Sequence, residues 1–317
     1  MTRLDVPFGL GYALPQVFPD GPIDPALVGR VARAAEEAGF ESLWTQQQPI
    51  GTAQCLDALT LLGYVAALTE RAHLGVSVLL LPLLDPLQLA KATASLDALS
   101  GGRLRLGIGL GAPRYYPPSG ADAGTRVARL LEALAVLKAL WTDDVVSHSG
   151  RFFRYDGVSV RPHPVRRPHP PVWFGGRVRA ALRRAAVHGD GWMGAGSSSG
   201  ADFVTHAAVL REELARAGRD PSTFPVSKRV YLAVDDDAAR ARARLRAWFA
   251  HDYGDADLAD RVAVWGRRDA VVERLAELVA AGANHLLLNP VVDIAEHVEI
   301  LRDLVPPSTV DSGGASG

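Results

Sequence analysis

Short apolar segments alternate with longer amphipathic segments from one end of this sequence to the other. Short apolar runs bounded by turn residues predict buried strands, and apolar residues spaced three and four apart predict helices. The apolar runs predict strands at residues 8–12, 41–45, 73–81, 103–110, 172–174, 191–193, 226–234 and 283–289. The amphipathic segments predict helices at residues 25–38, 56–68, 87–99, 126–141, 178–187, 201–217, 237–250, 270–281 and 294–304.

This alternation predicts an α/β fold, a (β/α)8 TIM barrel. Eight strands with intervening helices in about 300 residues is the count that this barrel requires. The run 76–81 is apolar throughout, as expected for a parallel strand buried on both faces. A doubly wound sheet is the competing architecture, but the glycines at 107–111 lead into Ala-Pro-Arg rather than into a helix. We expect one barrel domain over residues 1–305 and a disordered tail at 306–317.

One connection, residues 143–171, is longer than the others and is predicted to be an insertion between the fourth helix and the fifth strand. Connections of this length are usually functional or disordered. The segment ends in a proline-rich stretch that contains His163 and His169. A polyproline-type connector is favoured over a metal site because the two histidines have no carboxylate partner nearby. The sequence therefore predicts no metal centre.

A pair of glycines, Gly175 and Gly176, lies between the predicted strand 172–174 and the helix 178–187. Glycines let a backbone turn sharply and approach a ligand, and the free N–H groups of a helix start favour an anion. Arg177 adds positive charge at the same turn. One interpretation is a phosphate site, and the other is a tight strand-to-helix turn that needs glycine for its own geometry. The motif alone leaves both open.

The composition narrows the function classes. Hydrophobic residues make up 48% of the chain and the net charge is −1, without a basic stripe, so nucleic acid is not expected as a partner. Cys55 is the single cysteine, which excludes an internal disulfide. The first residues lack the apolar core of a signal peptide, and the apolar run 76–84 is too short to cross a bilayer. We expect a soluble, cytoplasmic protein without membrane partners.

Several segments resemble, in the right order, the luciferase-like superfamily of flavin- and deazaflavin-dependent oxidoreductases. They are spread along the chain between residues 38 and 193 and comprise residues 38–44, 74–82, 90–104, 107–109, 137–141, 150–153, 172–176 and 189–193. The resemblance implies a barrel that binds FMN or coenzyme F420 at the carboxyl ends of its strands, with a small-molecule substrate. It also raises a homodimer as one assembly, because members of the family are often dimers.

The resemblance also implies cofactor-binding residues. The phosphate would lie at Gly175, Gly176 and Arg177. The peptide bond between Ser77 and Val78 matches the place where such proteins often carry a non-proline cis peptide in a bulged strand, which supports the back of the flavin ring; the alternative is an ordinary buried strand. Two glycines of the fourth strand would let the ring approach the backbone, and these are Gly107 and Gly109.

Other positions depart from the family pattern. Residues 46–48 are three glutamines where many relatives carry an acidic residue and a histidine, and 112–118 replaces a usual cluster of Trp and Glu. The glutamate that F420-dependent sugar-phosphate dehydrogenases carry close to Leu110 is missing, which puts that activity in doubt. The catalytic residues are therefore not identified. Candidates for the substrate pocket, by their position at strand ends, are Tyr12, Gln16, Trp44, Gln48 and Tyr115.

Three functions remain in view. With F420, which the compact length and the Ser77–Val78 pattern slightly favour, the protein would transfer hydride to or from a small organic molecule. With FMN it would be a monooxygenase. The glutamine triplet also suits a flavin-binding relative without catalysis. An unrelated phosphate-binding barrel is disfavoured because lysines and paired carboxylates are scarce at the predicted strand ends.

Overall fold

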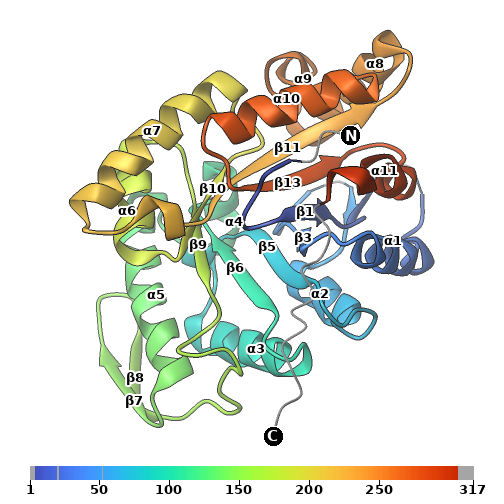
Figure 1. The fold of residues 1–317 in the computed structure, drawn as a ribbon. Coiled ribbons are helices and arrows are strands. Elements are labelled where there is room, and N and C mark those ends of the chain that lie inside the picture. Colours follow the sequence, from blue (N-terminus) through green and yellow to red (C-terminus); the bar gives the residue numbers. More distant parts are fainter. Residues whose placement is uncertain (1–3, 20, 52, 306–317) are drawn as a thin grey trace, which may run out of the picture.

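Eight parallel strands close on themselves to form a barrel, which confirms the predicted fold (Figure 1). The computed structural model describes residues 4–19, 21–51 and 53–305, so the tail predicted at 306–317 lies outside the described residues. Pairing of the sixth barrel strand with the seventh closes the ring. In chain order the barrel strands are β1 (Leu10–Ala13), β3 (Ser42–Thr45), β5 (His73–Leu79), β6 (Leu104–Ile108), β9 (Val172–Gly175), β10 (Gly191–Gly194), β11 (Val226–Val234) and β13 (His285–Pro290).

Helices form the outer layer, and each predicted helix is present within a few residues of its expected bounds (Figure 1). Local capping explains where several begin. Asp24 accepts a hydrogen bond from the backbone N–H of Leu27 at 2.9 Å, and a proline fills the first helical position. These helices are α1 (Pro25–Glu37), α2 (Ala58–Ala66), α3 (Pro86–Leu99), α5 (Arg126–Thr142), α6 (Arg179–His188), α7 (Gly200–Arg216), α8 (Ala238–Tyr253), α10 (Arg268–Ala280) and α11 (Ile294–Leu301).

The smaller elements are those that sequence periodicity did not predict, because they are too short to show a period. Residues 143–171 connect α5 to β9 and carry an antiparallel hairpin. Its turn is held by Glu132, whose carboxylate accepts backbone N–H bonds from residues 151–153. The additional elements are β2 (Val17–Phe18), β4 (Gln54–Cys55), α4 (Tyr116–Ser119), β7 (Val146–Ser149), β8 (Arg154–Val158), α9 (Asp257–Val262) and β12 (Val264–Gly266).

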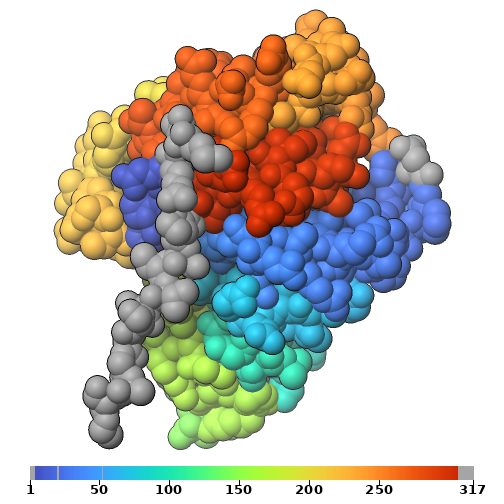
Figure 2. Space-filling view, turned by 45° about the vertical axis from the view of Figure 1, so that its right-hand side comes forward, coloured from blue at the N-terminus to red at the C-terminus, as the bar shows by residue number. Residues whose placement is uncertain are grey.

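The two ends of the described chain meet on one side of the barrel. In Figure 2 the blue segment of the first helices lies against the red segment of the last one, and α1 packs on α11. β1 pairs with β3 on one side and with β13 on the other, so the first barrel strand is joined to the last. No helix in residues 4–19, 21–51 and 53–305 is long and apolar enough to cross a membrane.

A small polar layer is buried inside the barrel. The Trp44 indole donates from Nε1 to Ser42 Oγ at 2.8 Å, and Ser42 Oγ lies 3.1 Å from Nε2 of His285. Nδ1 of His285 lies 2.8 Å from Ser227 Oγ. Complete burial lowers the pKa of His285 to about 3, so the imidazole is neutral near pH 7. Both ring nitrogens are therefore satisfied by hydroxyl groups rather than by charge.

The amino end of the barrel is closed by an ionic cluster. Glu41 pairs with Arg105 and lies 3.0 Å from Nδ1 of His73. Burial opposes ionisation of Glu41, but the hydrogen bond with His73 and the charge of Arg105 outweigh it and hold the pKa of Glu41 well below its usual range. The guanidinium carbon of Arg105 lies 5.4 Å from the Trp173 ring centroid. Charge at this end is thus neutralised within the fold, away from the carboxyl ends of the strands.

The neutral state of His285 predicts a pH dependence of stability. Between about pH 6.5 and pH 5 the unfolded chain protonates this histidine and the folded protein does not, so the free energy of unfolding should fall as the pH falls. In His285→Gln this part of the slope, at most about 1.4 kcal/mol per pH unit, should be lost. Urea unfolding at several pH values measures it. Equal slopes for the two proteins would show that His285 does not titrate as described.

Candidate active site at the carboxyl end of the barrel

The carboxyl ends of β5, β6 and β9 meet around the side chain of Val78. A Cβ atom placed on Gly109 would lie 2.7 Å from Val78 Cγ2, and one on Gly175 would lie 3.0 Å from Val78 Cγ1. The peptide bond between Ser77 and Val78 is cis, and the β5–β6 register shifts between Val76 and Leu79. The structure therefore brings together the residues that the family resemblance grouped, with the expected peptide geometry.

Gly107 belongs to the same group but lies deeper. A Cβ there would meet the carbonyl oxygen of Val76 at 2.3 Å and the sulfur of Met193 at 2.6 Å. Real Cβ contacts are not that short, so the barrel's own packing excludes a side chain at this position. The packing is a sufficient reason for Gly107, and the expected approach of a ring to this backbone stays a prediction.

Beneath Val78 lies an apolar floor. Trp44 and Trp173 stack at a tilt with their ring centroids 5.5 Å apart, and Met193, Ala13 and Leu287 complete a buried cluster that Val78 covers. These side chains come from alternate positions of the strands, as the interior of a closed barrel requires. A planar apolar group placed at the mouth would therefore meet carbon atoms below and backbone around it.

The glycine turn after β9 has a conformation and a packing of its own. The φ angle of Gly176 is +151°, and a Cβ on it would lie 2.6 Å from the Cβ of Ala181. Trp192 donates from Nε1 to the carbonyl oxygen of Gly176 at 2.8 Å, which fixes the turn. Within α6 the N–H of Ala181 bonds the carbonyl of Val178, and the exposed Arg177 precedes it. Tight packing thus accounts for Gly176, while the positive charge lies beside it.

A histidine that sequence reasoning missed lies beside this turn. Nδ1 of His206, on α7, is buried and has no hydrogen-bond partner among the described residues. The ring meets Trp192 edge-on at a centroid distance of 6.4 Å. Burial lowers the pKa of His206; the charge of Asp202 opposes that shift and the charge of Arg177 adds to it. Buried polar atoms are normally satisfied, so this nitrogen is an exception within the described residues. About thirty residues separate it from the turn, and no sequence spacing marks it.

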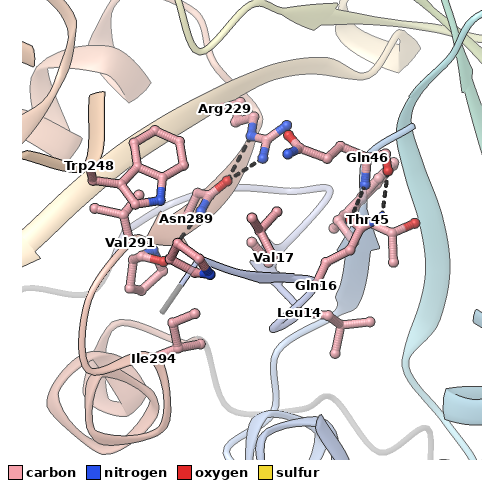
Figure 3. Close-up of a pocket in the computed structure, with 14 residues that line it drawn as sticks. Leu14, Gln16, Val17, Thr45, Gln46, Arg229, Trp248, Asn289, Val291 and Ile294 are labelled. Carbon is pink, nitrogen blue, oxygen red and sulfur yellow. Dashed lines mark hydrogen bonds between the residues drawn. The ribbon is translucent and has the colours of Figure 1, made fainter. Parts of the chain in front are cut away.

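A pocket occupies the other side of the barrel mouth, at the ends of β1, β3, β11 and β13 (Figure 3). Its wall is mostly apolar, and Arg229 is the one side chain among its described lining residues that carries a formal charge at pH 7. Trp44 belongs both to this wall and to the floor beneath Val78, so the two halves of the mouth adjoin. The lining consists of Ala13, Leu14, Gln16, Val17, Pro19, Trp44, Thr45, Gln46, Arg229, Trp248, Asn289, Pro290, Val291 and Ile294.

The glutamines near the pocket, Gln16 after β1 and residues 46–48 after β3, have different contacts. Gln16 donates to the carbonyls of Gln46 and Leu56 at 2.6 and 2.7 Å, and its Oε1 accepts the N–H of Gln46 at 2.8 Å. Gln47 accepts the N–H of Leu80 at 2.6 Å, which ties the loop after β3 to the loop after β5. The side-chain amides of Gln16 and Gln47 thus hydrogen-bond backbone N–H and C=O groups of the loops. The side chain of Gln46 extends into the pocket (Figure 3).

The predicted pocket residues have different outcomes. Trp44 and Gln16 line this pocket, and their contact with a substrate stays a prediction. Tyr12 was a wrong prediction, because side chains alternate along β1 and Tyr12 points outward, packed on Phe40 with ring centroids 4.9 Å apart. Its hydroxyl donates to the carbonyl of Ile294, and burial raises its pKa far above the usual range.

Gln48 and Tyr115 lie outside the lining of this pocket. Gln48 is half-buried beside Gly51, where a Cβ would lie 2.6 Å from its Nε2. Tyr115 follows β6 and is largely buried, and its hydroxyl accepts a hydrogen bond from Arg114 Nη2 at 3.0 Å. Arg229 and Asn289 were missed. A charged residue within the apolar strand 226–234 was the signal that could have found the arginine.

Metal ligands are not gathered at the mouth or elsewhere in residues 4–19, 21–51 and 53–305, which contain no group of three or more His, Cys, Asp or Glu side chains placed to hold an ion. His163 and His169, considered above as ligands, have other contacts. His169 stacks at a tilt on Trp141 with ring centroids 5.7 Å apart, and His163 contacts the guanidinium of Arg161.

Comparison with known proteins agrees with this geometry. The family model of luciferase-like monooxygenases matches residues 10–285. An F420-dependent glucose-6-phosphate dehydrogenase of Kineococcus radiotolerans is 31% identical over 234 residues, which are 71% of this chain and 68% of that protein. An F420-dependent hydroxymycolic acid dehydrogenase of Mycobacterium tuberculosis is 30% identical over 67% of this chain and 60% of its own length.

Solved structures share the fold over nearly the whole chain. An F420-dependent secondary alcohol dehydrogenase, in complex with an F420–acetone adduct, superposes with a TM-score of 0.82 at 20% identity and covers 94% of this chain and 98% of its own. The oxygenating component of 3,6-diketocamphane monooxygenase from Pseudomonas putida, in complex with FMN, gives 0.75 at 19% identity over 95% and 98%. At these identities the likeness shows the fold.

The packing of Gly176 predicts a stability effect. Gly176→Ala should lower the free energy of unfolding by about 1–3 kcal/mol, because the new methyl group meets Ala181 and φ lies in the glycine region. Gly63→Ala, in α2 with nothing within 4 Å of its Cβ, is the matched control and should stabilise the protein by about 0.5–1 kcal/mol. Urea unfolding compares them. If Gly176→Ala were as stable as wild type, the turn would not be packed as described.

Proposed function

The chain belongs to the luciferase-like monooxygenase family, and we propose that it is an oxidoreductase that uses coenzyme F420 to transfer hydride to or from a small organic substrate. The observation that carries the proposal is the seat around Val78, where Gly109 and Gly175 of two neighbouring strands pack against the Val78 side chain above an apolar floor. Such a seat suits a flat, largely apolar ring system.

Similarity favours F420 over FMN. Relatives at about 30% identity include enzymes named F420-dependent dehydrogenases from several organisms. FMN is the second candidate, in a monooxygenase, because an FMN-bound enzyme shares the fold. A flavin-binding protein without catalysis is the third. It is supported by the glutamines at 46–48, where Gln47 holds a loop instead of offering an acid or a base.

The residues at the mouth fit a phosphorylated cofactor of this kind. The phosphate would be held at the start of α6 by Arg177 and by backbone N–H groups of the glycine turn, with His206 Nδ1 as a further donor in its neutral tautomer. Val78 would support the ring, and Trp44 and Met193 would exclude water beneath it. When bound, F420 supplies the two-electron hydride chemistry, and the protein supplies orientation and a dry site.

The pocket beside this seat would hold the substrate. Its wall combines apolar side chains with neutral amides and one guanidinium, so it can orient a substrate without an obvious general base. The dehydrogenase relatives act on different molecules by their names, a sugar phosphate and a hydroxymycolic acid. The names of these relatives therefore do not identify the substrate of this chain, and the side chains that line its own pocket are the guide to it. A homodimer stays a prediction.

A cofactor-binding experiment tests the proposal. The protein is incubated with F420 or with FMN and passed through gel filtration, and the absorption spectrum of the protein peak is recorded. We expect F420 to co-elute and FMN to be retained less. Retention of FMN alone, with oxygen consumption after reduction, would favour the monooxygenase. Retention of neither cofactor would contradict the proposed function.

The phosphate seat predicts a change in affinity without a change in packing. Arg177 is exposed at the turn, so Arg177→Gln should weaken F420 binding by about tenfold or more while thermal stability stays the same. Arg183→Gln, exposed farther along α6, is the matched control and should bind as wild type. Fluorescence titration with F420 measures both. Equal affinities of the two variants would show that the phosphate lies elsewhere.

A further inference from the structure

Arg229 is placed at the boundary between the two halves of the barrel mouth. It projects from β11 into the pocket (Figure 3). Its Nη1 donates to the carbonyl oxygen of Ser77 at 3.2 Å. Its Nε donates to Oδ1 of Asn289 at 2.8 Å, and Nη2 donates to the same oxygen. The guanidinium is therefore fixed within reach of the peptide that would lie against the cofactor.

The bonding of this guanidinium is incomplete. Arginine has five N–H donors in a fixed plane, and three of them are used, which leaves one on each terminal nitrogen. Tyr231 lies along the group, with the guanidinium carbon 5.1 Å from its ring centroid. Stacking and two anchored edges hold an arginine in one orientation and reduce the entropy lost when a ligand binds.

The charge of Arg229 is also not matched by a bonded carboxylate. Its hydrogen-bond partners are a side-chain amide and a peptide carbonyl, both neutral, and no ion pair within 4.0 Å involves it in the part of the chain that the structure describes. Asp252, one turn after Trp248 on α8, is an acidic group whose pKa is affected by the charge of Arg229. Burial raises the pKa of Asp252, and the charges of Arg229, His251 and Arg114 oppose that shift. Asp252 makes no hydrogen bond or ion pair with Arg229 within the described residues.

The rest of the lining has no formal charge and consists of apolar side chains with the neutral polar groups of Gln16, Thr45, Gln46 and Asn289. Trp44, Trp248 and Ile294 surround Arg229 together with aliphatic and proline side chains. A partly buried cation that no carboxylate contacts directly is stabilised by a ligand that supplies one. The planar guanidinium fork matches the two oxygens of a carboxylate.

We propose that Arg229 binds a carboxylate of the substrate, and that this site acts on an apolar molecule that carries one carboxylate group. The proposal rests on the proposed function and names its substrate class. Bonding of Nη1 to Ser77 places the carboxylate end of the substrate next to the cofactor seat, while the apolar end lies along Trp248 and Ile294. Arg229 is then a residue that sets specificity and position.

Matched pairs of ligands test the proposal without turnover. Hexanoate and hexanamide, and 3-phenylpropanoate and its primary amide, are titrated at pH 7.5 into the F420-loaded protein and into the protein alone. Binding is followed by calorimetry and by tryptophan fluorescence, since Trp44 and Trp248 line the pocket. We expect the carboxylates to bind at least about tenfold more tightly than the amides. No preference, or no binding of the carboxylates, would overturn the proposal.

Variants assign the preference to Arg229. Arg229→Gln should bring the two affinities within about twofold of each other, and Arg229→Lys should keep part of the preference. Asn289→Asp is a second route, because its carboxylate would occupy Nε and Nη2 and neutralise the arginine that it leaves in place. Arg240→Gln, an exposed residue of α8 paired with Asp235, is the control and should keep the full preference. A preference that survives in both Arg229→Gln and Asn289→Asp would overturn the proposal.

The cofactor measurement separates this proposal from the proposed function. F420 retention is recorded for the same samples by its absorption. Retained F420 without a carboxylate preference contradicts the role of Arg229 and leaves the oxidoreductase proposal standing. A carboxylate preference that depends on Arg229 in a protein that does not retain F420 supports the binding site and contradicts the cofactor assignment.

Discussion

The indole of Trp44 is the constraint around which the barrel interior is arranged. It fills the centre so completely that neighbouring strands must carry glycine beside it: a Cβ on Gly11 would lie 2.6 Å from its Nε1, and one on Gly75 would lie 2.3 Å from its Cε3. Its single donor is satisfied by Ser42, and that hydroxyl is coupled to the neutral His285. A large aromatic group can be buried this deeply only when its polar atom has a partner and its neighbours give way.

The same indole connects the core to the mouth. One part of Trp44 packs on Trp173 in the floor below Val78, and another part lines the pocket that holds Arg229. The floor is therefore rigid because it is part of the folding core, and the site inherits that rigidity. Gln46 and Arg229, whose side chains can donate hydrogen bonds to a ligand, lie in the layer above this floor. Preorganised groups on a rigid base are what positioning of a substrate against a cofactor requires.

Packing accounts for each of the glycines at this mouth. Gly109 and Gly175 leave room for the Val78 side chain, and Gly107 and Gly176 leave room for Met193 and Ala181. A motif that looks like a ligand cradle in a sequence therefore contains residues that are there for packing alone. The features that suit an anion at the turn are the exposed Arg177 and the unpartnered nitrogen of His206.

The sequence by itself determined the fold, because strand and helix periodicities are local properties and the eightfold alternation admits one closed arrangement. It also placed Gly175 and Gly176 at a strand end from the strand boundary, whereas Ser77 and Val78 were assigned by the family resemblance. Only the tertiary structure decided which way side chains point, so Tyr12 faces outward and Arg229 inward. It also brought His206 to a turn about thirty residues away and left Arg229 without a bonded carboxylate. These facts depend on strand alternation and on contacts between distant segments, which no local pattern contains.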